Sequence, residues 1–152
     1  MKRVLLTGMS GTGKSSIVQE LLARGFKAVD IDDGWCESAP DGRQRWREDA
    51  IQQLLRTEDT NVLFLAGCEE NQVVFYDQFD HIVLLSAPVK VILERLATRT
   101  TNSYGKAPED LHRVLDDLAT VEPLLRQAAH HEVSTTVPVD KVATKILRLI
   151  DA

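Results

Sequence analysis

The sequence predicts an α/β fold in which helices cover both faces of a doubly wound sheet of five parallel strands. Three short runs are continuously apolar, at residues 4–6, 62–66 and 82–85. Strands that are covered on both faces need such runs, whereas half-exposed strands alternate apolar and polar residues. Amphipathic segments of helical period separate the runs. This alternation of buried strands and helices is the pattern of a doubly wound parallel sheet.

Each remaining element has its own signal. A helix is expected over residues 16–24, ended by Gly25, and a second strand over residues 26–30. Helical spacing of apolar residues predicts further helices over residues 43–55, over 89–98 after Pro88, and over 108–121, where Pro123 kinks or restarts the helix. A fifth strand over residues 132–135 and a closing helix over 139–150 complete the sheet and its cover.

Composition limits the class of protein. With 152 residues and 43% hydrophobic residues, residues 1–152 are expected to form a single domain. The net charge of −5 argues against a broad nucleic-acid-binding surface. No run of 18 apolar residues and no signal-peptide pattern occur, so we expect a cytoplasmic protein without membrane contact. Cys36 and Cys68 are too few for a disulfide framework or a zinc cluster.

The most specific motif lies between the first strand and the first helix. Residues 8–15 read Gly-Met-Ser-Gly-Thr-Gly-Lys-Ser, which is the G-x-x-x-x-G-K-[ST] pattern of a phosphate-binding loop. Backbone N–H groups surround the anion, Lys14 reaches the β- and γ-phosphates, and Ser15 supplies a hydroxyl to Mg²⁺. We therefore expect a nucleotide site that comprises Gly8, Met9, Ser10, Gly11, Thr12, Gly13, Lys14, Ser15 and Ser16.

Carboxylates follow the second strand. Because ligands bind outside the carboxyl ends of strands in open α/β sheets, Asp30 and Asp32 are candidate site residues. The chain is expected to stay extended here, so that alternate residues aim the two carboxylates in one direction. They could hold Mg²⁺ through water, accept a proton from an attacking hydroxyl, or bind a polyol. A helix cap or an Asx-turn is the structural alternative.

Two arginines precede a polar segment. Arg95 and Arg99 are four residues apart at the end of the helix predicted over residues 89–98, so they are expected to share a face. The polar, glycine-containing stretch that follows has the composition of a mobile lid at about residues 99–107. An arginine that arrives with lid closure neutralises charge on the transferred phosphoryl group. Lys106 is a further candidate cation; an ordinary solvated lysine is the alternative.

Together, the loop, the Asp30-x-Asp32 pair and the Arg95/Arg99 segment resemble the P-loop group of small-molecule and nucleoside monophosphate kinases, especially its shikimate kinase-like branch. The resemblance implies that Asp30 lies near Mg²⁺ and the reacting hydroxyl and that Asp32 binds the acceptor. It also implies that Arg95 stacks on adenine, that Arg99 reaches the ATP phosphates, and that Pro138 contacts adenine.

The acceptor side only partly follows this branch. Shikimate kinases carry a Phe-Arg pair that Trp46-Arg47 approximates, here on the helix predicted over residues 43–55, and a glycine run that Gly67-Cys68 does not reproduce. This departure argues against shikimate as the acceptor. Arg47, Gly67 and Cys68 remain candidate acceptor contacts, and Cys68, Glu69 and Asn71 are expected at the pocket floor. A helix N-terminus that favours negative charge is the alternative for Glu69.

The strand over residues 62–66 ends without Asp or Glu. Motor-type and AAA-type ATPases place a Mg²⁺-linked carboxylate there, so its absence disfavours those classes and shifts the metal role to Asp30 or Asp32. The function predicted is transfer of the γ-phosphoryl group of ATP, with Mg²⁺, to a hydroxyl or phosphate of a small metabolite. Lys14, Asp30 and Arg99 would be catalytic, with Ser15 and Asp30 at the metal.

Alternatives remain open at this point. Within kinases these are nucleoside or nucleoside monophosphate kinases and antibiotic phosphotransferases, because both arginines and carboxylates occur on the acceptor side. From a different class, an ATP-binding regulatory switch would bind ATP and hydrolyse it only slowly. The sequence leaves open whether the protein is a monomer or a homodimer.

Overall fold

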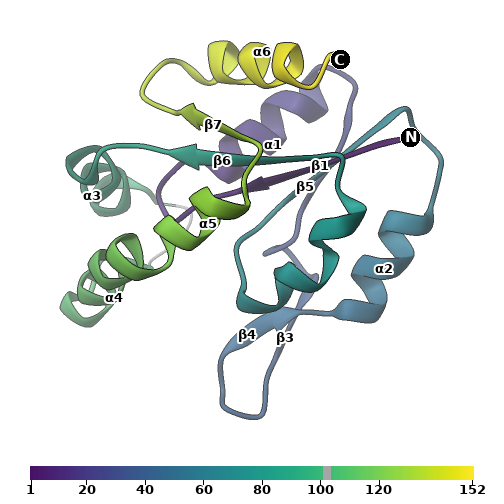
Figure 1. Cartoon of the computed structure of the whole chain (residues 1–152). Helices are drawn as coiled ribbons and strands as arrows, with labels where there is room; N and C mark the ends of the chain where they lie inside the picture. The colour runs from purple at the N-terminus through teal and green to yellow at the C-terminus, as the bar shows by residue number, and fades with distance from the viewer. Residues whose placement is uncertain (101–103) are drawn as a thin grey trace.

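The computed structural model describes residues 1–100 and 104–152. Its centre is a sheet of five parallel strands: β1 (Lys2–Thr7), β2 (Lys27–Asp30), β5 (Val62–Ala66), β6 (His81–Ser86) and β7 (His131–Ser134). They lie in the order β2-β5-β1-β6-β7, and neighbouring strands pair in parallel (Figure 1). The predicted fold class is therefore confirmed, and each predicted strand lies within two residues of its observed bounds.

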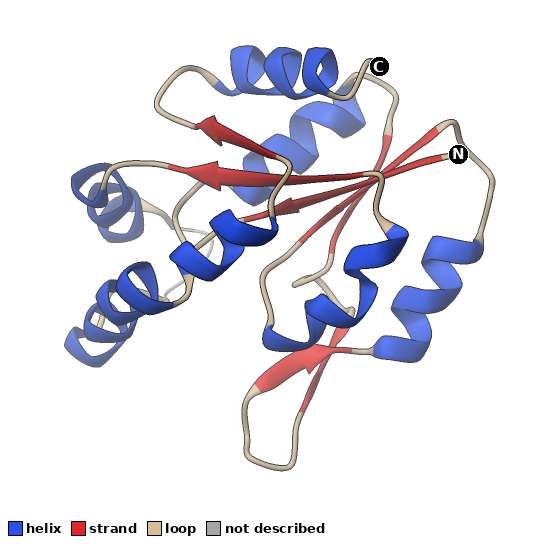
Figure 2. Ribbon diagram, in the orientation of Figure 1, coloured by secondary structure: helices blue, strands red, loops and turns tan. Residues whose placement is uncertain are grey.

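Helices cover both faces of this sheet (Figure 2). They are α1 (Lys14–Ala23), α2 (Glu48–Arg56), the 3₁₀ helix η1 (Glu70–Gln78), α3 (Val89–Thr98), α4 (Pro108–Thr120), α5 (Glu122–Ala128) and α6 (Val139–Leu149). Pro88 and Pro138 precede α3 and α6, and Pro108 opens α4, which are positions where a missing N–H costs no helical hydrogen bond. Within the described ranges, no helix is long and apolar enough to cross a membrane.

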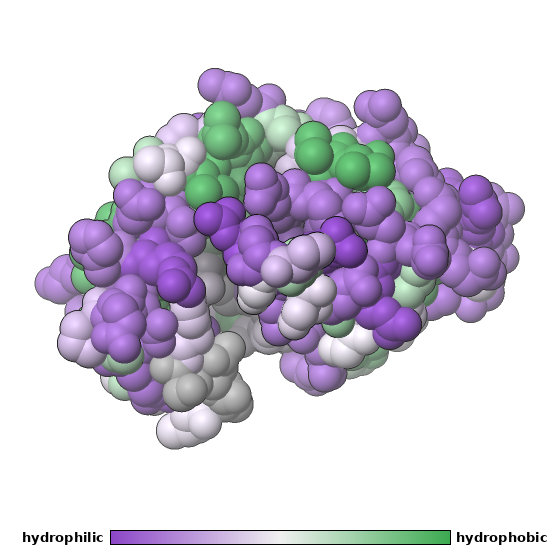
Figure 3. Space-filling view, turned by 90° about the horizontal axis from the view of Figure 1, so that it is seen from below, coloured by the Kyte–Doolittle hydropathy of each residue, from purple (hydrophilic) through white to green (hydrophobic). Residues whose placement is uncertain are grey.

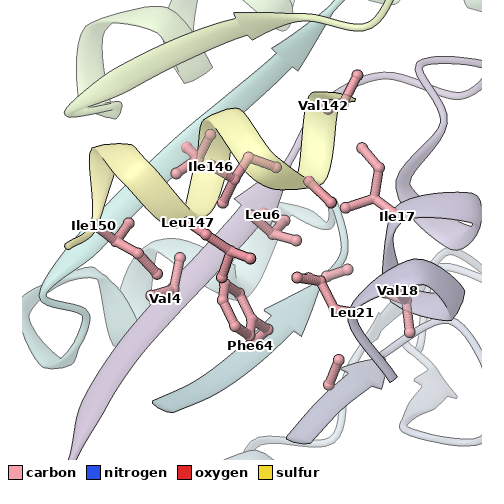
Figure 4. Packing of buried hydrophobic residues seen from close by; sticks show 14 of the residues in the cluster. Val4, Leu6, Ile17, Val18, Leu21, Phe64, Val142, Ile146, Leu147 and Ile150 are labelled. Atoms are coloured by element: carbon pink, nitrogen blue, oxygen red, sulfur yellow. The ribbon is translucent and has the colours of Figure 1, made fainter. Parts of the chain in front are cut away.

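Two apolar layers hold the sheet between its helices. On one face, α1 and α6 pack against the strands through buried side chains that include Ile17, Leu21 and Ile146 around Phe64 (Figure 4). On the other face, α2 and η1 pack through Ile51 and Phe75. Because both faces are covered, the strands are apolar at nearly every position, as their sequences require.

The segment before α2 differs from the prediction. Residues 43–47 are not helical: β3 (Cys36–Ser38) and β4 (Gln44–Trp46) form an antiparallel hairpin, and α2 begins at Glu48. The turn contains Pro40-Asp41-Gly42, and Gly42 has a φ of 85°, which is readily adopted only by glycine. Trp46 is fully buried, as a core-facing helical residue would be, so its apolar character fitted either structure.

The carboxyl ends of all five strands point to one edge of the sheet because the strands are parallel (Figure 1). Residues from the loops after β1, β2, β5 and β7 therefore meet there. This edge holds most of the residues singled out from the sequence.

Candidate active site

The loop after β1 has the backbone that the phosphate-binding motif predicts. A Cβ at Gly8 would lie 2.4 Å from the carbonyl oxygen of Leu85, so only glycine allows this approach to β6. Gly13 precedes α1 with a φ of 99°. Thr12 is fully buried, and its hydroxyl donates to the Met9 carbonyl at 2.8 Å. The N-terminus of α1 thus points at the space enclosed by the loop, where an anion is favoured.

Lys14 crosses this loop. Its ammonium donates to the carbonyl oxygens of Gly8 at 2.5 Å and Met9 at 3.1 Å. These contacts hold a positive charge over the loop amides. A phosphate that enters the loop would meet this ammonium and the N-terminus of α1 together.

Ser15 and Asp30 are in direct contact. The Ser15 hydroxyl donates to Oδ2 of Asp30 at 2.7 Å, which joins the first turn of α1 to the end of β2. Asp30 Oδ1 accepts from the backbone N–H of Asp32 at 3.2 Å, and the Asp30 carbonyl accepts from Asp33 N–H at 3.0 Å. The chain therefore turns after Asp30. The expectation of an extended segment is wrong, and Asp30 makes the Asx-type contact considered as the alternative.

Because of this turn, Asp32 lies close to Cys36 and Glu69. Ligand atoms of Asp32, Cys36 and Glu69 all lie within 4.8 Å of one another, and we call these residues the acidic cluster. Reduced hydration raises the pKa of the Asp32 carboxyl, although Lys14 opposes this effect. Burial, together with the charge of Asp32, raises the pKa of Glu69 to about 7. Burial also raises the pKa of the Cys36 thiol to about 11.

The floor beside this cluster is formed by Gly67 and Trp46. A Cβ at Gly67 would lie 3.2 Å from both Nε1 and Cζ2 of Trp46 and from Cβ of Ile31, so glycine gives the indole its place. Asn71, which the sequence predicts at the pocket floor, makes hydrogen bonds to the backbone of Trp46. Its amide oxygen accepts from Trp46 N–H and its amide nitrogen donates to the Trp46 carbonyl, both at 2.9 Å, so Asn71 holds the end of β4.

Cys68 lies between the phosphate loop and the helices α4 and α5. It packs with Met9 and Val121 in a small apolar cluster. Burial raises the pKa of its thiol, with Lys14 opposing this effect. Cys68 therefore contributes an apolar wall near Lys14.

Arg95 joins the phosphate loop to the segment after β7. Its guanidinium donates to the Gly11 carbonyl at 3.2 Å, to the Thr135 hydroxyl at 2.9 Å and to the Thr135 carbonyl at 2.5 Å. Pro138 follows three residues later and precedes α6. The structure thus brings Arg95 and the Thr135–Pro138 segment to one side of the loop. Thr135 was not singled out from the sequence, because nothing in a lone threonine marks it.

Arg99 lies beyond the end of α3, with a φ of −67° and a ψ of 146°, and its guanidinium donates to the Tyr104 carbonyl at 2.5 Å. Lys106 donates to the Ala97 carbonyl at 3.2 Å. Arg99, at the start of the predicted lid, therefore contacts a residue within it, and Lys106, near the end of the lid, contacts the last turn of α3. Residues 101–103 of that lid lie outside the described residues.

The sequence predicts Arg47 within a helix, whereas the structure has it as the N-cap residue of α2. Its backbone N–H donates to the Trp35 carbonyl at 2.9 Å. It lines a polar hollow of about 370 Å³ with residues of the hairpin and of α2, namely Glu37, Arg45, Glu48, Asp49 and Ala50. The face that carries this hairpin is mostly hydrophilic, with small separate hydrophobic areas (Figure 3).

The sequence is compatible with either a functional or a helix-capping role for Glu69, and it does not mark Cys36. Glu69 is in fact the N-cap residue of η1 and shares a capping box with Gln72, yet its carboxylate also belongs to the acidic cluster. Its place directly after a buried strand was the available signal. Cys36 reaches the cluster through the hairpin, which the sequence reasoning missed.

Comparisons with known proteins agree with this geometry. The sequence matches the family model described as "AAA domain" over residues 4–116. Shikimate kinase 2 of Yersinia enterocolitica is 28% identical over an alignment of 178 residues, which covers 97% of this chain and 94% of that protein. The family model carries the AAA name, whereas β5 ends without the carboxylate expected of AAA-type ATPases.

Solved structures share the fold across nearly the whole chain. Shikimate kinase from Acinetobacter baumannii in complex with shikimate has a TM-score of 0.71 at 19% identity, covering 99% of this chain and 93% of that one. A gluconokinase from Sinorhizobium meliloti has a TM-score of 0.66 at 17% identity, covering 99% and 91%. The chain therefore belongs to the AAA domain family and is a P-loop kinase with a shikimate kinase-like fold.

Proposed function

We propose that the protein transfers the γ-phosphoryl group of ATP to a hydroxyl group of a small metabolite, with Mg²⁺ as cofactor. The observation that carries this proposal is the contact between the Ser15 hydroxyl and the Asp30 carboxylate beside Lys14. Phosphoryl transfer needs a phosphate cradle, oxygen ligands for a divalent cation and a base for the attacking hydroxyl within one small space. The loop, Ser15 and Asp30 supply these three parts.

The residues fit Mg²⁺. Ser15 and Asp30 both offer oxygen, which is the ligand atom that Mg²⁺ prefers, and they do so at the mouth of the phosphate loop. When bound, the ion neutralises charge on the β- and γ-phosphates. Ser15 would bind it directly and Asp30 either directly or through water.

The chain's own groups then account for the remaining chemistry. Backbone N–H groups of the loop and the Lys14 ammonium bind the phosphates, and Asp30 accepts the proton of the attacking hydroxyl. Arg95, which contacts Thr135, would cover the adenine with Pro138. Arg99 would reach the phosphates as the lid segment closes, which neutralises charge and excludes the water that would hydrolyse ATP. Asp32, Arg47, Gly67 and Cys68 would line the acceptor side.

Two of the similar structures are small-metabolite kinases. The Acinetobacter baumannii protein is a shikimate kinase in complex with shikimate, and the Sinorhizobium meliloti protein is a gluconokinase. A hydroxyl acceptor is favoured here because the site offers it a carboxylate, that of Asp30. A second phosphate group would instead be bound by a cluster of arginines. A nucleoside monophosphate acceptor is correspondingly disfavoured. We further propose that the protein acts in the cytoplasm, as a monomer or homodimer, without nucleic-acid or membrane partners.

Thermal-shift screening with ATP and Mg²⁺, followed by a metabolite panel, tests this function. A ligand at a hundred times its dissociation constant stabilises the native state by about 2.7 kcal/mol, which a thermal shift detects. Acceptors that add to the shift are then assayed for ADP release. We expect release that depends on the acceptor and is lost in Lys14→Ala. ATP hydrolysis that no acceptor accelerates would instead favour a regulatory switch.

A further inference from the structure

The charge around the acceptor side narrows the class of acceptor. The acidic cluster follows Asp30 and Gly67, so it lies at the carboxyl ends of β2 and β5 next to the proposed base. It brings two carboxylates, of Asp32 and Glu69, within 4.8 Å of each other. Two carboxylates this close repel each other unless a cation or a proton lies between them.

The nearby arginines do not neutralise this cluster. Arg45 pairs with Glu37 at 3.3 Å, and Arg43 pairs with Glu70 at 3.8 Å and with Asp41 at 3.9 Å. Within residues 1–100 and 104–152, no Lys or Arg side chain forms an ion pair with Asp32 or Glu69. Lys14 acts on both at longer range, but bound phosphates would engage its charge.

Among the described residues, the wall and the floor beside the acidic cluster carry no cationic side chain. Arg47, the cation proposed for the acceptor side, lines the polar hollow together with three acidic residues. The wall toward α5 is apolar, where Met9 and Cys68 pack with Val121. The floor carries an unpaired donor: Trp46 is fully buried, and its Nε1 has no hydrogen-bond partner among the described residues. The N–H edge of this indole is turned to Gly67, the residue that leads into Cys68 and Glu69. Because this nitrogen is itself buried, the partner that it calls for is an enclosed water rather than the acceptor.

We propose that the acceptor is a hydroxyl compound that carries a protonated amine, such as an amino sugar or an amino alcohol. Its ammonium group would lie between the carboxylates of Asp32 and Glu69, and its oxygen atoms would take the remaining polar positions near Gly67. A carboxylate-bearing or phosphate-bearing acceptor would meet repulsion at the same place. This inference rests on the proposed function, because it identifies the acceptor of that same site.

The chemical step balances within this arrangement. The acceptor oxygen forms a bond to the γ-phosphorus of ATP while the bond from that phosphorus to the β,γ-bridging oxygen breaks. The electron pair of that bond leaves with ADP. The proton of the acceptor hydroxyl passes to Asp30, and the ammonium group keeps its own protons, so only oxygen is phosphorylated.

Matched acceptors test the proposal. Three related polyols differ in charge: glucosamine carries an amine, glucose is neutral, and gluconate carries a carboxylate. Amino alcohols and amino cyclitols are added to the panel as further amine-bearing acceptors. With [γ-³²P]ATP and Mg²⁺ at neutral pH, we expect an amine-bearing acceptor to take up label with a kcat/KM at least about tenfold above that of its neutral analogue. Preference for the carboxylate-bearing acceptor would overturn the proposal while the kinase function stands.

Variants locate the effect. Glu69→Gln and Asp32→Asn should each raise KM for the amine about tenfold or more, because each removes one charged partner, and should leave KM for ATP unchanged. Glu70→Gln is the matched control, since Glu70 is the next residue along but is exposed and pairs with Arg43. It should leave both values unchanged.

Two further outcomes would contradict the proposal. If no amine in the panel is labelled or raises the melting temperature, the amine class is wrong, and labelling of another acceptor shows that the kinase function nevertheless holds. If labelling fails for every acceptor, the proposed function fails as well. Calorimetric titration with Mn²⁺ tests whether the acidic cluster binds a metal ion. If Glu69→Gln abolishes Mn²⁺ binding but leaves KM for the amine-bearing acceptor unchanged, the cluster binds a metal cation and not the acceptor.

Discussion

The Ser15 hydroxyl donates a 2.7 Å hydrogen bond to the Asp30 carboxylate, although the two residues lie on different elements, α1 and β2. Parallel pairing places β2 at the edge of the sheet next to β5, and α1 leads from β1 back to β2. The contact therefore follows from the topology of the fold. It joins the residue that we propose as a Mg²⁺ ligand to the residue that we propose as the base.

The first prediction concerns Asp30. Asp30→Asn keeps the size of the side chain but removes the base, so kcat should fall by about 10²- to 10⁴-fold while KM for ATP changes little. Steady-state kinetics with the identified acceptor measure both values. Asp33→Asn, at an exposed neighbour, is the control. Equal losses in turnover and in ATP affinity would assign Asp30 to the nucleotide or to the structure rather than to the chemical step.

The second prediction concerns Arg95. Its guanidinium bonds the backbone of the phosphate loop to Thr135, so Arg95→Ala should weaken ATP binding and lower stability by about 1.5–3 kcal/mol. Arg95→Lys cannot make the paired bonds of a planar guanidinium and should recover only part of the loss. Nucleotide titration by calorimetry and urea unfolding measure the two effects, with the exposed Lys90→Ala on α3 as control. Unchanged ATP affinity in Arg95→Ala would separate this residue from the nucleotide site.

The third prediction concerns Asn71. Because its amide makes two hydrogen bonds to the Trp46 backbone, Asn71→Ala should destabilise the protein by about 1–3 kcal/mol. The urea midpoint should shift without a change of slope. Gln53→Ala, at an exposed position of α2, should be nearly neutral. If Asn71→Ala left stability unchanged and raised only acceptor KM, the expectation from sequence that Asn71 lines the pocket would be supported.

The fourth prediction is a pH dependence. Glu69 has its pKa raised to about 7 by burial and by Asp32, so its carboxylate is largely protonated below this pH and charged above it. The kcat/KM for an amine-bearing acceptor, which reports the free enzyme, should therefore rise as the pH rises through 7. For stability the sign is opposite: a carboxyl with a raised pKa in the folded state loses stability as pH rises from about 4.5, its unfolded value, to about 7.

Glu69→Gln should remove both dependences. The measurements are pH profiles of kcat/KM and of the free energy of unfolding for the wild type and the variant, collected at constant ionic strength. A kcat/KM profile that keeps its rise near pH 7 in Glu69→Gln would show that another group titrates, and Glu69 would lose its role in binding.

The strands and most helices could be predicted from sequence because their signals are local. Continuous apolar runs require burial on both faces, and Pro88 and Pro108 mark helix starts. The hairpin could not be separated from a helix, because Trp46 keeps a helical spacing to Ala50 and Leu54 and would be buried in either structure. The Pro40-Asp41-Gly42 turn was the signal for it.

The residues of the site likewise divide into those that could be predicted from sequence and those that depend on the folded structure. The phosphate loop has a fixed spacing because neighbouring backbone groups bind the anion, so the sequence carries it. Asp30 could be placed from its position after β2, but its Asx-type turn, which sends Asp32 toward Glu69, depends on the local backbone. Cys36 and Thr135 reach the site only through tertiary contacts, across the hairpin and through Arg95, and neither has a sequence signal of its own.

The most direct test of the account follows the phosphoryl group itself. Wild-type protein, Lys14→Ala and Asp30→Asn, each checked for folding by circular dichroism, are incubated with [γ-³²P]ATP, Mg²⁺ and the acceptor selected by thermal shift, and products are separated by chromatography. We predict label on the acceptor hydroxyl with the wild type and loss of that label in both variants. Label that appears only in inorganic phosphate, or transfer to the acceptor that persists in Lys14→Ala, would contradict the account.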